Sequence, residues 1–177
     1  MKTLPRHQAL QKWQTYWADT KDEFFKVEAV QDYGGEDAQW SDSYKLWLNG
    51  DKNGAIKLLK NGSNEWSKQT SQKPVLKRRI RIAKEPYCPY LEWEIMHYKL
   101  VNIPYGDEQV YLVNYEDVAG ESLLGDFMIF DNIKVVNSNY SEIGKMLNMD
   151  FYEENEDISE FLALKERLLL RAKLLTI

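Results

Sequence analysis

Apolar residues follow a helical spacing over much of residues 1–72. Leu10, Trp13 and Trp17 recur every three to four residues behind Pro5, a residue that favours a helix start. The same spacing predicts further helices over 40–48 and 55–60, with Asn-Gly pairs at their ends. Alternation over Phe24–Val30 predicts one short strand between them. We therefore expect residues 1–72 to be mostly helical, with a single strand.

From residue 75 onward, apolar and polar residues alternate, which is the pattern of half-buried strands. The segments with this pattern are Val75–Lys84, Tyr90–Val101, Gln109–Val113, Asp126–Phe130, Ile133–Tyr140 and Lys145–Tyr152. Because the turns between them are short, they predict an antiparallel meander without helical crossovers.

Asp157 and Glu160 have the spacing of a capped helix start and predict a closing helix over 157–175. The fold prediction is thus α+β: N-terminal helices, an antiparallel meander sheet of six or seven strands over 75–152, and one C-terminal helix. We expect residues 1–177 to form a single domain.

The composition is that of a folded protein and argues against several classes. With 44% hydrophobic and 29% charged residues, disorder is not expected. A formal charge of −5 argues against direct binding of double-stranded DNA, which requires a basic surface. No apolar run has the length of a membrane span, and no apolar region follows the basic N-terminus. We therefore expect a cytoplasmic protein without a membrane segment.

Candidate catalytic chemistry is sparse. Cys88 is the only cysteine and the chain has two histidines, so we expect no metal site and no cofactor. Glycine-rich phosphate loops and metalloprotease motifs are absent from the sequence. A Cys88–His97 nucleophile pair is disfavoured, because nine extended residues separate the two by about 30 Å. Asp126 and Asp131 point to opposite faces of one strand, so we expect each to end the strand and begin a turn.

The densest basic segment, Lys77–Lys84, is the strongest candidate for a binding site. Alternation places Lys77, Arg79 and Arg81 on one face of a strand and apolar residues on the other. In a hairpin with Tyr90–Val101, the arginines would oppose Glu92 and Glu94.

Two interpretations of this arrangement remain open. One is a structural ladder of cross-strand ion pairs. The other is an anion site, in which guanidinium groups bind phosphate or carboxylate and tyrosines stack against the ligand. The candidate site residues are Arg79, Arg81, Glu85, Tyr87, Tyr90, Glu94, Asp126 and Asp131.

The same segment resembles a family of bacterial domains. The resemblance rests on Arg79-Ile80-Arg81-Ile82-Ala83-Lys84-Glu85-Pro86, Tyr90-Leu91-Glu92-Trp93-Glu94, Asp126-Phe127-Met128-Ile129-Phe130-Asp131, and Phe25-Lys26-Val27-Glu28 with Tyr33. These residues are similar to the centre of a domain-of-unknown-function family that is abundant in actinomycetes. The chain departs from the family at Met128, where Trp is usual. The resemblance implies a shared fold without an established activity. Because members are often encoded beside helix-turn-helix regulators, it also implies such a protein as a partner.

Two functional hypotheses follow. The first is a non-enzymatic regulatory or protein-interaction module, favoured by the missing catalytic motifs and by a content of six Trp and eleven Tyr. The alternative is an anion- or nucleotide-binding, or phosphoester-hydrolysing, domain. In that case arginines would neutralise phosphate while a carboxylate acts as a base or holds Mg²⁺.

Overall fold

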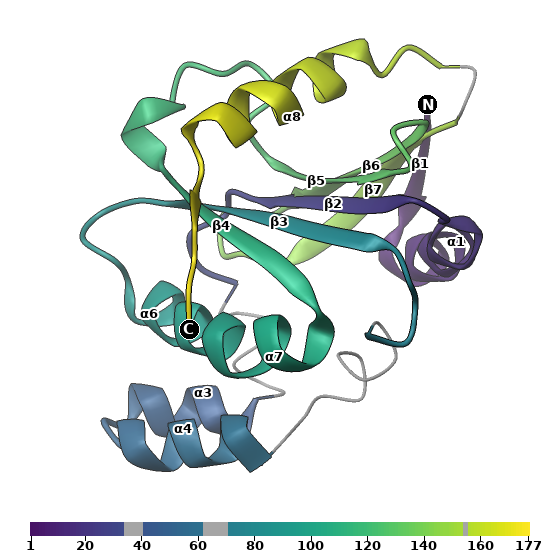
Figure 1. Cartoon of the computed structure of the whole chain (residues 1–177). Coiled ribbons are helices and arrows are strands. Elements are labelled where there is room, and N and C mark those ends of the chain that lie inside the picture. Colours follow the sequence, from purple (N-terminus) through teal and green to yellow (C-terminus); the bar gives the residue numbers. More distant parts are fainter. Residues whose placement is uncertain (34–40, 62–70, 154–155) are drawn as a thin grey trace.

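One mixed sheet of eight strands forms the centre of the structure (Figure 1). This computed structural model describes residues 1–33, 41–61, 71–153 and 156–177. Within them the strand order is β1-β7-β6-β5-β2-β3-β4-β8. The strands are β1 (Lys2–Pro5), β2 (Glu23–Glu28), β3 (Leu76–Ala83), β4 (Glu108–Asn114), β5 (Asp126–Phe130), β6 (Lys134–Tyr140), β7 (Met146–Tyr152) and β8 (Lys173–Leu174).

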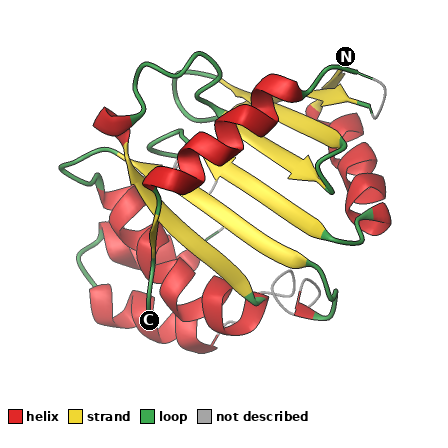
Figure 2. Ribbon diagram, turned by 45° about the horizontal axis from the view of Figure 1, so that its top comes forward, coloured by secondary structure: helices red, strands yellow, loops and turns green. Residues whose placement is uncertain are grey.

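Helices cover both faces of this sheet. They are α1 (Arg6–Asp19), α3 (Asp42–Leu48), α4 (Lys52–Asn61), α6 (Pro89–His97), α7 (Ile103–Gly106) and α8 (Ser159–Arg171), with the π-helical segment η1 (Tyr98–Asn102) and the 3-10 turn η2 (Tyr115–Asp117). Helix α8 crosses one face, and α1, α6 and α7 lie on the opposite face (Figures 1 and 2). Helices α3 and α4 pack against each other outside α6.

The expected antiparallel meander is wrong. Strands β2, β3 and β4 are parallel neighbours, whereas the other strand pairs are antiparallel. Parallel neighbours require a crossover, and the segment expected as the strand Tyr90–Val101 is that crossover: it forms α6 and η1. Pro89 in the first turn and Cys88 as the N-cap begin this helix. Without a strand there, the expected hairpin does not exist.

Most of the other expected strands form with small changes in their ends. The turn expected at Asp131 and Asn132 is present: both residues have positive φ, 51° and 58°, and Ile133 N–H donates to the Phe130 carbonyl at 3.1 Å. The short edge strands β1 and β8 were not expected. The closing helix ends at Arg171, after which the chain returns to the sheet as β8 beside β4. Of the part expected to be mostly helical, residues 34–40 and 62–70 lie outside the described residues.

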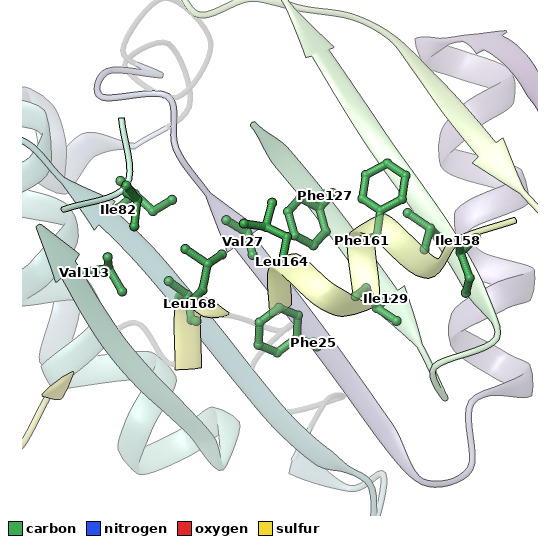
Figure 3. Close-up of a cluster of buried hydrophobic side chains, with 13 residues drawn as sticks. Phe25, Val27, Ile82, Val113, Phe127, Ile129, Ile158, Phe161, Leu164 and Leu168 are labelled. Carbon is green, nitrogen blue, oxygen red and sulfur yellow. The ribbon is translucent and has the colours of Figure 1, made fainter. Parts of the chain in front are cut away.

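The face under α8 holds an apolar core (Figure 3). Its sheet members include Phe25, Val27, Ile82, Phe127 and Ile129, and α8 adds Phe161, Leu164 and Leu168. These positions are odd in β2 and β5 but even in β3. The alternate positions of the same strands therefore face α1 and α6, and in β2 and β3 several of them are charged. Among the described residues, no helix is both long enough and apolar enough to cross a membrane.

Candidate functional site

Strand β3 places a row of three buried cations on the face covered by α6 and η1. Lys77, Arg79 and Arg81 occupy alternate positions, as the alternation predicted, and each is less than a tenth exposed. Because buried charges are stable only when paired, the partners of these groups decide whether the row is available to a ligand.

Arg81 is fully buried and its guanidinium is held entirely by the protein. Its Nε donates to Glu94 Oε2 at 2.6 Å. Its terminal nitrogens donate to three backbone carbonyls, those of Glu28, Ile82 and Gln31, at 3.1, 3.2 and 3.3 Å. The ring of Tyr33 lies 5.5 Å from the guanidinium carbon. Arg81 thus pairs with one of the two glutamates that the expected hairpin placed opposite the arginines, but Glu94 comes from helix α6 and not from a strand.

Arg79 bridges two carboxylates from the neighbouring strands. One terminal nitrogen bonds Glu28 Oε1 at 2.7 Å, and the other bonds Glu108 Oε1 at 2.9 Å. Asn102 donates to the second oxygen of Glu108 at 2.7 Å, and the ring of Tyr98 lies 5.3 Å from the guanidinium. The positive charge of Arg79 is therefore balanced inside the protein.

Glu28 is the shared acid of this network. Its Oε1 pairs with Lys26 at 2.5 Å as well as with Arg79, and its Oε2 accepts the Tyr98 hydroxyl at 2.6 Å. Burial opposes ionisation of Glu28, but the charges of Arg79, Lys26 and Arg81 outweigh it and hold its pKa well below 4.5. For Glu94, by contrast, burial raises the pKa even though Arg81 acts in the opposite direction.

Asp126 differs from the other buried carboxylates. Its Oδ1 accepts the backbone N–H groups of Ala29 at 2.8 Å and Val30 at 3.1 Å, and its Oδ2 accepts the Tyr33 hydroxyl. Burial raises its pKa, and the hydrogen bonds reduce this effect only in part. Among the residues that the structure describes, four carboxylates are buried, and Asp126 is the one without an ion pair.

A cavity of about 390 Å³ opens on this face between α1 and the charged network. Its apolar wall comes from α1, β2, β5 and β7 and includes Trp13, Phe24, Met128 and Met149. Its polar lining comes from Gln14, Lys26, Arg79, Asp126, Ser138 and Tyr140. A smaller recess of about 210 Å³ shares Lys26, Tyr140 and Met146 with this cavity and reaches Glu28, Tyr33, Tyr90 and Glu94. Together the two hollows extend across the sheet from α1 to α6.

The structure brings five of the expected site residues together. Arg79, Arg81, Tyr90, Glu94 and Asp126 belong to the network or line its hollows. The other three lie elsewhere. Glu85 and Tyr87 line a separate hollow beside β8, and Asp131 lies at the far end of β5, beside Lys21 and Lys134.

Sequence reasoning missed several residues of the site. They are Lys26, Glu28, Tyr33, Tyr98 and Ser138. Lys26 and Glu28 alternate with apolar residues, and alternation alone does not show that the face they share is covered by a helix. The signal that could have found three of the five is the family resemblance, which includes Phe25-Lys26-Val27-Glu28 and Tyr33.

The two candidate nucleophile partners are separated by helix α6. Cys88 caps its N-terminus and contacts the Gln31 carbonyl at 3.2 Å, whereas His97 is its last residue and lies against Trp93. Burial, with the charge of Arg79, lowers the pKa of His97 to about 4. Nine residues of helix rise about 13.5 Å, so the two side chains do not form a pair. Among the described residues, no group of three His, Cys, Asp or Glu side chains has an arrangement that would hold a metal ion.

Sequence comparison shows that most of the chain matches a domain-of-unknown-function family. Residues 11–175 match the profile of a domain of unknown function, DUF6879. The chain belongs to this family. The match covers α1 from Gln11 onward, the charged network, α8 and every cavity-lining residue except Leu10, so nearly all of the candidate site lies within the DUF6879 region. No curated protein matches the chain.

Proposed function

We propose that this chain is a non-enzymatic regulatory module that binds a small organic molecule in the cavity between α1 and the charged network. The observation that carries the proposal is the composition of that cavity. It joins an apolar wall to a few convergent polar groups, which is the usual construction of a small-molecule site. A volume of about 390 Å³ falls within the range of such sites.

The saturation of the charged network supports binding over catalysis. The guanidinium groups of Arg79 and Arg81 already donate to Glu28, Glu94, Glu108 and backbone carbonyls. They are therefore poorly placed to neutralise a phosphate. A network with its partners in place also fixes the floor of the cavity before any ligand arrives. Such preorganisation lowers the entropic cost of binding.

The regulatory part of the proposal rests on the family resemblance. In this proposal a partner protein, such as the helix-turn-helix regulator that the resemblance implies, binds the chain differently when the cavity is occupied and when it is empty. Affinity capture of the tagged protein from its host tests this part, and a reproducible absence of any partner contradicts it.

A cavity-filling variant tests the binding site itself. Met128→Trp places a larger side chain on the cavity wall, at a position where the resembling family usually has Trp. We expect compounds from a metabolite library to raise the melting temperature of the wild type but not of Met128→Trp. Leu147→Trp, at a half-exposed position outside the lining, is the matched control and should keep the wild-type response. A flat response of the wild type, or equal responses of wild type and Met128→Trp, contradicts the proposal.

A further inference from the structure

The cavity contains one buried acid whose charge no basic side chain balances. The charged residues that line it are Lys26, Arg79 and Asp126. Lys26 and Arg79 are paired with Glu28 and Glu108, whereas Asp126 accepts hydrogen bonds from two backbone N–H groups and one hydroxyl. The charge that remains to be balanced within this lining is therefore negative.

Asp126 retains the capacity to bind a further donor. A carboxylate offers about four acceptor positions, and three are in use: two on Oδ1 and one on Oδ2. The remaining position is on Oδ2, the oxygen that accepts the Tyr33 hydroxyl. A ligand N–H that reached it would form a charge-assisted hydrogen bond, the stronger class of such bonds.

Ser138 supplies a second, independent polar group in the same place. It pairs directly with Asp126 across β5 and β6, and it lines the same cavity. As a residue Ser138 is only 8% exposed, but its hydroxyl is not one of the fully buried side-chain atoms that lack a partner in the described part of the chain. Because Ser138 lines the cavity, its hydroxyl can donate a hydrogen bond to, or accept one from, a group bound there.

The opposite part of the cavity suits an apolar group. Trp13, Phe24, Met128 and Met149 line it, and Trp13 Nε1 is already bonded to Met128 Sδ at 3.0 Å. A ligand body in contact with this wall would gain apolar burial without competing for polar partners. The cavity thus separates an apolar wall from a polar end at Asp126 and Ser138.

We infer that the ligand is an organic amine, whose protonated amino group binds Asp126 and Ser138 and whose apolar body packs on Trp13 and Met128. This inference rests on the proposed function and adds the class of ligand. An ammonium group has three donors, which match the open position on Asp126 Oδ2 and the hydroxyl of Ser138. The ion pair would also compensate the one buried carboxylate that lacks a counterion in the described part of the chain.

Three compounds with one apolar body and different head groups test the inference: 2-phenylethylamine, 2-phenylethanol and 3-phenylpropanoate. In calorimetric titrations of the wild type, we expect the amine to bind at least about tenfold more tightly than the alcohol and the carboxylate to bind weakest. Asp126→Asn should remove the preference for the amine, and Ser138→Ala should reduce it. The head-group series on the wild type is decisive even where a variant does not fold.

Asp131→Asn is the matched control. Asp131 also accepts backbone N–H groups and lies on the same hairpin, but outside the cavity. We expect this variant to bind the amine as the wild type does. Equal binding of alcohol and amine, or an unchanged preference in Asp126→Asn, overturns the amine inference. If the compounds nevertheless bind at a site that Met128→Trp blocks, the amine inference fails but the proposed function still holds. Absence of binding by all three also overturns the inference, whereas the library experiment decides the proposed function.

Discussion

Asp126 and Asp131, at the two ends of β5, bind the backbone at opposite ends of the neighbouring strand β2. Asp126 accepts the N–H groups of Ala29 and Val30, just after β2. The N–H groups that bind Asp131 are those of Lys21, Asp22 and Glu23, at 2.8, 2.8 and 2.9 Å. Because β2 and β5 are antiparallel neighbours, the two ends of β5 lie beside the two ends of β2, so each carboxylate reaches the backbone at one end of β2. Both carboxylates therefore accept backbone hydrogen bonds that join β5 to β2. Asp126 is buried whereas Asp131 lies near solvent, and their pKa values shift in opposite directions.

The first prediction concerns Asp131, which lies near solvent. Burial would raise the pKa of this carboxyl group, but the three backbone hydrogen bonds and Lys73 outweigh it and lower the pKa below 3.8. A lowered pKa stabilises the fold above pH 3.8, and this stabilisation is lost as the pH falls through the folded-state pKa. We expect Asp131→Asn to reduce the free energy of unfolding by about 1 kcal/mol at pH 7. Urea titrations at pH 7 and pH 3 should show this difference shrinking at the lower pH.

Asp126 should show the opposite pH dependence. Because burial raises its pKa above 3.8, its ionisation destabilises the fold as the pH rises from 3.8 through the folded-state value. Asp126→Asn lacks this ionisation. The free energy of unfolding of the variant should therefore improve relative to the wild type over that window, in the same urea titrations. If the free energies of unfolding of the two variants, each relative to the wild type, changed with pH in the same direction, the opposite pKa shifts of Asp126 and Asp131 would be contradicted.

The buried pair of Arg81 and Glu94 gives a prediction about stability. Removing one partner leaves a buried charge uncompensated, which costs about 3–5 kcal/mol in proteins. We therefore expect Arg81→Met to lower the free energy of unfolding by this amount. The double variant Arg81→Met/Glu94→Leu should be more stable than Arg81→Met alone. Its recovery will be incomplete, since three backbone carbonyls also lose a donor.

A double-mutant cycle in urea measures this coupling. The matched control is Glu121→Gln, which removes a carboxylate bound by Arg167 and Arg171 at the surface. Exposed ion pairs contribute little, so this change should be clearly smaller than that of Arg81→Met. Strictly additive effects of Arg81→Met and Glu94→Leu would show that the two side chains do not stabilise the fold as a pair.

The sequence predicted the strands in which polar and apolar positions alternate. Alternation in β3 separated Arg79 and Arg81 from Ile80 and Ile82, and the structure confirms this division. Strands β2, β5, β6 and β7 were also located, because each has one clearly apolar face. What alternation does not contain is the direction of pairing, which depends on the crossovers between strands.

Helix α6 shows why the rest was not predicted. Leu91, Trp93 and Ile95 alternate as in a strand, which places Glu94 on the opposite, charged face of that expected strand. In the structure Glu94 is buried by its pairing with Arg81, so the buried positions follow a helical spacing that hydrophobicity alone does not display. Pro89 in the first turn was the available signal for a helix start. The cavity could not be predicted either, since Asp126 and Ser138 meet only through the register of β5 and β6.

The last prediction concerns Gly144, in the turn between β6 and β7. It has a φ of +73°, and a Cβ at this position would overlap the carbonyl oxygen of Asp32. Gly144→Ala should therefore strain the turn and push away the segment that carries Tyr33, the donor to Asp126. We expect a loss of about 1–3 kcal/mol in the free energy of unfolding, measured in urea. Gly120→Ala is the control, because a Cβ there meets no atom within 4 Å. Equal stabilities of the two variants would show that Gly144 does not hold Tyr33 in place.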